Sequence, residues 1–388
     1  MPDFIPFALP LIGVQEIDEV INTLRSGWLT TGPKTTQFEK DFEQFIGVSH
    51  ALAVNSATSG LHLALEAIGI GKGDKVITTP YTFTATVEVI RYLGADPVLV
   101  DIDPNTFNID PDKIREIASK YDNITAIMPV HFAGQSCEMD VIKEIAIEHN
   151  WKIVEDAAHA LPTTWQGKMI GTLSDITVYS FYATKTIATG EGGMIVSNNE
   201  DYIKRMKVMR LHGISKDVFD RYTSDKPSWF YEVIEPGYKY NMTDVAASLG
   251  IHQLKKAWAF QERREWIAQQ YNDAFADLPI CTPYVAHPSD THAWHLYVIK
   301  LELESLTINR DQFIELMTEE GIGTSVHFIP LHIHPYWRDQ YNYKPEDFPV
   351  ALDVYNRAVS LAIYPKMTDD DVTRVIDAVR KILKDKLQ

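Results

Sequence analysis

The chain has 388 residues, of which 45% are apolar and 23% are charged, and its formal net charge is −17. This length allows two domains with large cores, and the composition is that of an ordinary globular protein. An acidic surface repels phosphate backbones, so no nucleic acid partner is expected. The two cysteines, Cys137 and Cys281, lie far apart, which argues against a disulfide framework or a cysteine-built zinc site.

The N-terminal stretch MPDFIPFALPLIG has three prolines and neither Lys nor Arg. It lacks the basic start and unbroken apolar run of a secretion signal, and no stretch approaches the ~18 apolar residues of a membrane span. A cytoplasmic protein without a membrane partner is therefore expected. Helical spacing of apolar residues then begins at Val14 and ends at Ser26-Gly27, and a second amphipathic stretch carries Phe38, Phe42 and Phe45.

Short apolar runs of strand length follow, and helix-like segments such as 59–67, 85–93 and 139–149 separate most of them. Strands that alternate with helices predict a mostly parallel sheet covered on both faces. Ligands of such sheets bind at the C-terminal ends of the strands. The predicted strands are residues 51–54, 75–78, 97–100, 125–130, 152–154, 176–180 and 194–196.

The pattern changes after about Met242. A long helical stretch reaches roughly residue 275, and it is followed by a strand over 296–301 and amphipathic segments near 311–320 and 369–383. We predict a large domain over residues 1–254 and a smaller C-terminal α/β domain over residues 255–388, with a helix bridging the boundary.

The most informative stretch, residues 180–193, reads SFYATKTIATGEGG and follows an apolar strand. Glycines let a backbone turn sharply and approach a ligand closely. Lys185, at the strand end beside such a loop, could form a Schiff base with an aldehyde cofactor. The alternative for this segment alone is a surface lysine before a turn.

Two further segments point to the same chemistry. Asp156 follows an apolar strand, where a carboxylate could hold the protonated ring nitrogen of pyridoxal 5′-phosphate (PLP); the alternative is a helix N-cap. Residues 55–60, NSATSG, lie between a strand and a helix, where hydroxyls and N–H groups could bind a phosphate. The alternative there is plain capping by Ser56 or Thr58. The order of phosphate loop, aspartate and lysine on one domain is more specific than any single segment.

These motifs resemble the DegT/StrS family of PLP-dependent nucleotide-sugar aminotransferases, of PLP-dependent transferase fold type I (aspartate aminotransferase-like). That fold is a large, mostly parallel sheet domain with a smaller C-terminal α/β domain. Within the family the arrangement most resembles UDP-4-amino-4-deoxy-L-arabinose synthase and related enzymes that aminate a 4-keto UDP-sugar. The matching stretches are residues 26–33, 55–65, 73–80, 82–86, 129–134, 155–159, 180–193, 236–244 and 292–295.

The resemblance implies roles for residues around the cofactor. Lys185 would be the Schiff-base lysine and proton shuttle, and Asp156 would pair with the pyridinium nitrogen. His159 matches the position beside the cofactor's phenolate oxygen, and Phe83 matches the aromatic residue that stacks on the ring. The hydroxyls that would hold the phosphate are those of Thr58, Ser59 and Ser180.

The resemblance also implies a homodimer with shared active sites, because residues 238–241 match a segment that reaches a neighbouring subunit's phosphate site. Many family members have Asn where this chain has Lys239, and Arg where it has Asn241, so which of the two contacts phosphate stays open. The substrates implied are L-glutamate and a keto-sugar nucleotide, for building a surface glycan such as O-antigen. Residues matched to positions near the sugar nucleotide are Trp28, Leu29, Thr30, Tyr240, His327 and Tyr364.

Two other functions are weighed against the aminotransferase. A PLP-dependent sugar dehydratase of this kind would carry His in place of Lys185, and a non-catalytic regulator would lack Lys185 or Asp156. Residues 69–73, GIGKG, precede a strand and therefore predict a turn, not a dinucleotide site. His327, His332 and His334 form one histidine cluster, and His292 and His295 form a pair. No carboxylate or cysteine lies at a typical spacing near the first cluster, so substrate contact or ordinary hydrogen bonding is expected rather than a metal.

Overall fold

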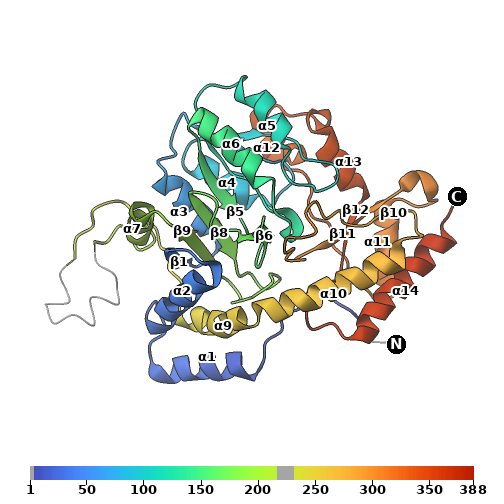
Figure 1. The fold of residues 1–388 in the computed structure, drawn as a ribbon, viewed down its shortest axis with the longest axis horizontal. Coiled ribbons are helices and arrows are strands. Elements are labelled where there is room, and N and C mark those ends of the chain that lie inside the picture. Colours follow the sequence, from blue (N-terminus) through green and yellow to red (C-terminus); the bar gives the residue numbers. More distant parts are fainter. Residues whose placement is uncertain (1–3, 216–230) are drawn as a thin grey trace.

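The computed structural model describes residues 4–215 and 231–388, and its centre is a seven-stranded sheet in the order β1-β9-β8-β5-β4-β2-β3 (Figure 1). β3, β2, β4, β5 and β8 pair in parallel, which confirms the predicted mostly parallel α/β architecture. β9 runs antiparallel to both β1 and β8, which the sequence did not indicate. The strands are β1 (His50–Val54), β2 (Lys75–Thr78), β3 (Asp96–Leu99), β4 (Ile124–Ile127), β5 (Lys152–Asp156), β8 (Ile176–Ser180) and β9 (Gly193–Ser197).

Helices cover both faces of this sheet, because side chains that alternate along each strand point to opposite faces. One core joins β1, β8 and β9 to helices that carry Phe38, Ile142 and Leu254, and the other joins the same strands to helices that carry Leu61 and Met206. The helices of this region are α1 (Val14–Ser26), α2 (Pro33–Ile46), α3 (Ala57–Ala67), α4 (Ala85–Tyr92), α5 (Pro111–Ala118), α6 (Met139–His149), α7 (Glu200–Met209) and α9 (Asp244–Lys255).

A second, antiparallel sheet has the order β10-β11-β12, and its core is separate from those of the large sheet. The elements here are β10 (Ile280–Cys281), β11 (Tyr297–Leu301), β12 (Ala358–Leu361), α10 (Ala257–Phe275), α11 (Arg310–Glu319), α12 (Pro335–Tyr341), α13 (Pro349–Arg357) and α14 (Asp369–Asp385). A short hairpin, β6 (Thr164–Trp165) and β7 (Lys168–Met169), and the 3-10 turns η1 (Phe132–Gly134), η2 (Leu303–Ser305), η3 (Leu331–Ile333) and η4 (Pro345–Asp347) complete the described elements.

The predicted long helix up to residue 275 is two helices, α9 and α10, which meet at Lys256. Phe260 of α10 packs in the core of the large sheet, whereas Ile267 and Phe275 pack in the core of the small one. Figure 1 shows α10 extending from α9 towards α14. The division after residue 254 stays a prediction, and it falls at the end of α9. In the described residues, no helix has the length and apolar character needed to cross a bilayer.

Asp244, the first residue of α9, supports the start of another helix. Its carboxylate accepts hydrogen bonds from the backbone N–H groups of Gly32 (2.8 Å), Lys34 (3.1 Å) and Thr35 (2.9 Å), at the N-terminus of α2. It also accepts one from the Thr35 hydroxyl (2.7 Å), and its side chain is buried. These bonds satisfy N–H groups that a helix start leaves free, and the carboxylate complements the helix dipole.

Replacing Asp244 with alanine is therefore expected to lower the free energy of unfolding by about 2–4 kcal/mol, because several buried donors lose their acceptor at once. Urea denaturation followed by circular dichroism measures the change. Asp18→Ala, at an exposed position of α1, is the matched control and should change stability little. Equal stability of the two variants would contradict this account of the α2–α9 junction.

Candidate active site

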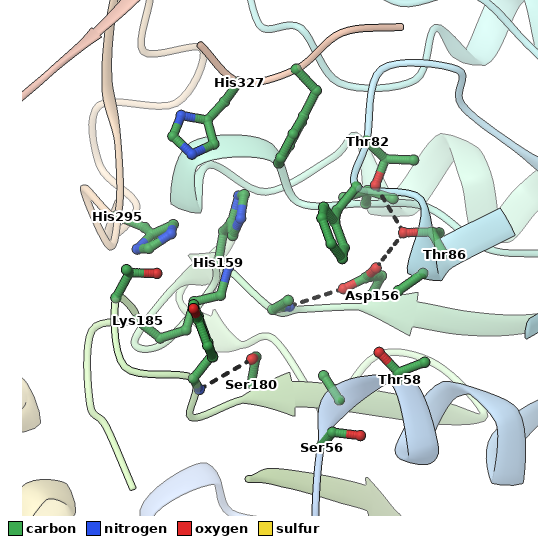
Figure 2. A pocket seen from close by; sticks show the side chains of 18 of the residues that line it. Ser56, Thr58, Thr82, Thr86, Asp156, His159, Ser180, Lys185, His295 and His327 are labelled. Carbon is green, nitrogen blue, oxygen red and sulfur yellow. Dashed lines mark hydrogen bonds between the residues drawn. The ribbon is translucent and has the colours of Figure 1, made fainter. Parts of the chain in front are cut away.

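A cavity of about 630 Å³ opens at the C-terminal ends of the parallel strands, as expected for such a sheet (Figure 2). Its wall combines the start of α3, the β2–α4 loop, the end of β5 and the β8–β9 loop with residues of the smaller sheet region. Side chains from these elements that converge on it include Thr58, Phe83, Asp156, His159, Ser180, Lys185, His295 and His327.

Asp156 is the last residue of β5, and only 5% of its surface is exposed. Its Oδ2 atom accepts a hydrogen bond from the Thr86 hydroxyl (2.8 Å), and its Oδ1 atom accepts one from the N–H of Ala158 (3.1 Å). No helix begins after Asp156, so the N-cap alternative is wrong. Burial raises the pKa of this carboxyl, while the bond from Thr86 opposes the rise. A nearby positive group would therefore be bound strongly.

Lys185 lies in the loop that connects β8 to the antiparallel β9, and it lines the same cavity as Asp156. Burial lowers the pKa of its ammonium group to about 8, and the carboxylate of Asp156 acts in the opposite direction. The alternative of a surface lysine before a turn is not what the structure shows, because the side chain is partly buried in the cavity wall. Its amine becomes increasingly neutral as the pH rises through about 8, and a nucleophile or proton acceptor has to be neutral.

The segment from Asn55 to Gly60 forms the start of α3. It lies across the cavity from the β8–β9 loop that carries Lys185, here called the lysine loop. Ser56 is the N-cap of α3, since its hydroxyl accepts a hydrogen bond from the N–H of Ser59 (3.1 Å), so the capping alternative holds for this residue. Ser56 and Thr58 line the cavity. Ser59 is buried, its hydroxyl donates to Asn55 (2.6 Å), and it is not part of the cavity wall. Thr58 therefore faces the cavity, whereas Ser59 does not.

Gly193, the first residue of β9, brings this strand against the start of α3. A Cβ atom at position 193 would lie 2.8 Å from the backbone N of Ala57 and 2.9 Å from the backbone C of Ser56. Only glycine permits this approach of β9 to the start of α3. Gly60 has a similar role, because its Cβ would lie 2.6 Å from Val178 of β8. These two glycines therefore allow β8 and β9 to lie close to the start of α3.

His159 is buried, and its Nδ1 atom accepts a hydrogen bond from the N–H of Ala133 (3.3 Å). Because burial holds the pKa of this imidazole well below its ordinary value, the ring is neutral and its proton is on Nε2. The His327 Nδ1 atom is 2.8 Å from the Ser360 hydroxyl, and burial lowers the pKa of His327 to about 4. His159 and His327 thus offer neutral ring nitrogens to the cavity.

The structure brings together some of the predicted site residues and leaves others apart. Phe83 lines the cavity with 61% of its surface exposed. Tyr364 lies in the core of the small sheet, away from the cavity wall. Other predicted residues that do not line this chain's cavity are Trp28, Leu29, Thr30, Lys239, Tyr240 and Asn241.

These outlying residues nevertheless form one group. Asn241 donates from Nδ2 to the Thr31 hydroxyl (2.6 Å), and the Thr31 hydroxyl donates to the carbonyl of Met242. The backbone N–H of Asn55 donates to the carbonyl of Tyr240 (2.7 Å), which places the 238–241 segment beside the segment that precedes α3. Two stretches more than 200 residues apart in the sequence therefore lie together, with Thr31 and Asn241 buried and Leu29 and Lys239 exposed.

Sequence reasoning missed several cavity residues. Tyr182 and Glu191 lie in the lysine loop, so their closeness to Lys185 in the sequence could have indicated them as cavity residues. Val326 and Phe328 flank His327, which the sequence did indicate, whereas Phe7 comes from a segment without a chemical motif and no sequence signal indicated it. His332 bonds the carbonyl of Pro345 and is not in the cavity wall. In residues 4–215 and 231–388, no three His, Cys, Asp or Glu side chains are grouped as a metal site would require.

The comparisons with known proteins agree with this geometry. Residues 10–380 match the model of the DegT/DnrJ/EryC1/StrS aminotransferase family, so the chain belongs to that family. It is a PLP-dependent sugar aminotransferase with the fold type I architecture. The combination of amine, carboxylate and hydroxyl-lined helix start in one cavity fits PLP. The family and its aminotransferase members favour a transaminase over the dehydratase and the non-catalytic regulator.

Particular relatives span almost the whole chain. The spore coat polysaccharide biosynthesis protein SpsC of Bacillus subtilis is 52% identical over 98% of this chain and 97% of its own length. The protein MJ1066 of Methanocaldococcus jannaschii is also 52% identical, over 98% of each. The structure of Spr1654 from Streptococcus pneumoniae, assigned as a sugar aminotransferase and solved in a PMP form, has a TM-score of 0.92 and 32% identity, covering 98% of this chain and 99% of its own. Helicobacter pylori PseC, an aminotransferase of pseudoaminic acid biosynthesis, has a TM-score of 0.91 and 28% identity, covering 99% of this chain and 100% of its own.

The lowered pKa of Lys185 predicts how cofactor loading depends on pH. The neutral amine attacks an aldehyde, and a pKa of about 8 makes the amine increasingly neutral as the pH rises through 8. The rate at which PLP recombines with the cofactor-free protein should therefore rise to a plateau with a midpoint near pH 8. Stopped-flow absorbance at a series of pH values measures it. A midpoint near the ordinary lysine value would contradict the burial of this amine.

Proposed function

We propose that this enzyme transfers the amino group of L-glutamate to the keto group of a sugar nucleotide, a 4-keto UDP-sugar, in the cytoplasm. The product would enter a surface glycan. The observation that carries the proposal is the presence of Lys185 and Asp156 in one cavity of a chain from the sugar aminotransferase family. The names of two relatives support the glycan role, since SpsC is named for spore coat polysaccharide and PseC for pseudoaminic acid.

The residues of the cavity would divide the chemistry among themselves. When bound, PLP supplies an aldehyde and a protonated pyridine ring that stabilises negative charge at the reacting carbon. Asp156 would hold the proton at the ring nitrogen. Lys185 Nζ would take the proton from Cα of L-glutamate and, in the second half-reaction, donate a proton to the sugar carbon that receives the nitrogen. His159 would donate its Nε2–H to the phenolate oxygen of the cofactor.

Binding of the phosphate would use groups from the start of α3 and from β8. Thr58 and Ser180 line the cavity and would donate their hydroxyls, and the free N–H groups of α3 would add a favourable dipole. Ser59 would support the phosphate site indirectly: its hydroxyl is already bonded to Asn55, and this bond would hold the loop before α3 in position. Phe83 would stack on the cofactor ring from the β2–α4 loop.

We further propose a homodimer in which each subunit completes the other's site. The group formed by residues 28–31 and 238–241 is absent from this chain's own cavity wall, which supports a role at a neighbouring subunit's cavity. Lys239 would bring the positive charge to the phosphate, held by its hydrogen bond to Asn241. On α1, Val14, Ile17 and Leu24 are exposed, and a subunit interface would bury this apolar area.

A panel of keto-sugar nucleotides assayed with L-glutamate tests the proposed substrates. The panel would contain 4-keto and 3-keto sugars linked to UDP and to dTDP, and mass spectrometry would measure the amino sugar and 2-oxoglutarate formed. Equal amounts of both products with a 4-keto UDP-sugar are expected. Amination of only dTDP-linked or 3-keto sugars would overturn the substrate assignment, and loss of water without 2-oxoglutarate would indicate a dehydratase.

A further inference from the structure

His295 is a buried histidine of the cavity wall that none of the roles above uses. It comes from the segment before β11, and only 5% of its surface is exposed. Its ring centroid is 4.3 Å from that of His159, and Figure 2 shows both rings on the same side of the cavity as Lys185. Its Nδ1 atom is buried and has no hydrogen-bond partner among the described residues.

The backbone around His295 is held firmly. Trp294, the preceding residue, has a left-handed conformation (φ 48°), which is unfavourable for a bulky side chain. The buried guanidinium of Arg264 on α10 donates to the carbonyls of Trp294 (3.1 Å), His295 (3.2 Å) and Ile363 (2.7 Å). The N–H of Ala293 also donates to the carbonyl of Gly134 (3.0 Å). The ring is therefore fixed at the cavity by the surrounding backbone.

The surroundings make the His295 ring neutral, with its proton directed at the cavity. Burial, aided by His159, Lys185 and Arg264, holds its pKa well below the ordinary value. Since Nδ1 is buried without a partner, a proton there would leave an unsatisfied N–H donor, which is rarer in proteins than an unsatisfied acceptor. The proton therefore belongs on Nε2, so His295 offers the cavity an N–H donor without a charge.

An uncharged donor suits the two substrates of a transaminase. The reacting carbon of an amino acid carries a carboxylate, whereas the reacting carbon of a keto sugar has uncharged neighbours. A fixed cation would bind the carboxylate well but would be left buried and unpaired when the sugar is bound, at a cost of several kcal/mol. A neutral N–H can donate to a carboxylate oxygen in one half-reaction and to a hydroxyl oxygen in the other. Among the described residues that line the cavity, Lys185 is the only lysine or arginine.

We propose that His295 is a substrate-binding residue whose Nε2–H receives the α-carboxylate of the amino donor and, in the second half-reaction, a hydroxyl oxygen of the sugar. This inference rests on the proposed function, because it takes an amino acid and a keto sugar as the two substrates. It assigns to the enzyme a carboxylate site built from a neutral imidazole in place of a cation.

Binding of 2-methyl-L-glutamate to the PLP-loaded enzyme tests the proposal. This compound keeps the α-carboxylate but has no α-proton, so its titration by cofactor absorbance measures affinity without turnover. His295→Phe, which removes the donor, should weaken binding about 10- to 100-fold, the loss expected for a hydrogen bond to a charged group. His295→Gln, whose amide nitrogen can replace Nε2, should bind nearly as wild type does. If the phenylalanine variant does not fold, His295→Leu gives the same comparison.

His332→Phe is the matched control. His332 is also buried and also has an Nδ1 atom without a partner in the described chain, but it is not in the cavity wall. This variant should keep wild-type affinity for 2-methyl-L-glutamate. Equal affinity of wild type, His295→Phe and His295→Gln would overturn the role of His295, and so would equal weakening in the His295 and His332 variants.

The experiment distinguishes a wrong role for His295 from a wrong choice of amino donor. If wild type takes another amino acid in place of L-glutamate, the proposed donor is wrong, and the 2-methyl form of the accepted amino acid is titrated instead. Weaker binding to His295→Phe than to His295→Gln would still support the carboxylate site, and equal binding would still overturn it. As a second measurement, wild type should favour L-glutamate over 4-aminobutyrate, which lacks the α-carboxylate. The phenylalanine variant should lose most of this preference.

Discussion

Replacing Lys185 with alanine is expected to abolish transamination and to remove the absorbance band that bound PLP gives near the visible edge. The variant lacks the amine that condenses with the cofactor's aldehyde, and it also lacks the group that moves the proton at the reacting carbon. Since each loss alone is severe, turnover should fall by roughly 10⁴-fold or more. Absorbance spectra and the 2-oxoglutarate formed from L-glutamate measure the two effects separately.

Two further variants show whether the amine itself is required. Lys185→Arg keeps a positive charge but has no amine that can condense with an aldehyde, so it should be as inactive as Lys185→Ala. Lys152→Ala removes an exposed lysine at the other end of β5 from Asp156 and should retain full activity. Substantial activity in Lys185→Ala would end the assignment of this lysine, whatever the activity of the controls.

Asp156→Asn is expected to lower turnover by about 10²- to 10⁴-fold while the protein still binds PLP. The amide keeps the shape of the side chain, but it has no negative charge to hold a proton on the ring nitrogen. Loss of one partner from a buried charged pair costs about 3–5 kcal/mol, and each 1.36 kcal/mol is a factor of ten in rate. Single-turnover measurements with L-glutamate follow the effect on the proton-transfer step.

A control for this substitution is Asp290→Asn. Asp290 also accepts hydrogen bonds from backbone N–H groups, those of Gln166 (2.7 Å) and Gly167 (2.8 Å), but it lies outside the main cavity. Its amide variant should retain normal turnover. If Asp156→Asn transaminated as fast as Asp290→Asn, the carboxylate would have no part in the chemistry.

Much of the fold could be predicted from the sequence because local patterns carry it. The predicted strands 75–78 and 176–180 coincide with β2 and β8, and the predicted helix 139–149 coincides with α6. These segments are buried or amphipathic in a regular way, so periodicity identifies them. The antiparallel β9 could not be foreseen, since an apolar strand between two neighbours has the same pattern in either direction. The strand β12 was missed for a different reason: it has only four residues and follows α13 directly, so its short apolar run does not stand out from that helix.

The site was predictable only as far as chemistry marks its residues. Lys185, Asp156 and Thr58 stand in motifs and do line one cavity. The partner of Asp156, Thr86, has an ordinary position in a helix, and the bond between them depends on how α4 packs against β5. The sequence marks His295 as half of a histidine pair and as part of a stretch that resembles the family, but it indicates no role for this residue. Its closeness to His159 arises from the meeting of two segments over 130 residues apart, and local sequence does not encode such a meeting.

The contact of Gly193 with Ser56 and Ala57 limits how the enzyme can be re-engineered. Because the backbone of Gly193 in β9 lies against Ser56 and Ala57, an insertion in the β8–β9 loop would change the position of Lys185 relative to the start of α3. Changes intended to widen substrate scope are better made on the opposite wall, at Leu296, Val326 and Phe328, which belong to segments outside this junction. A library restricted to that wall would vary the accepted sugar and leave the residues proposed to bind the cofactor unchanged.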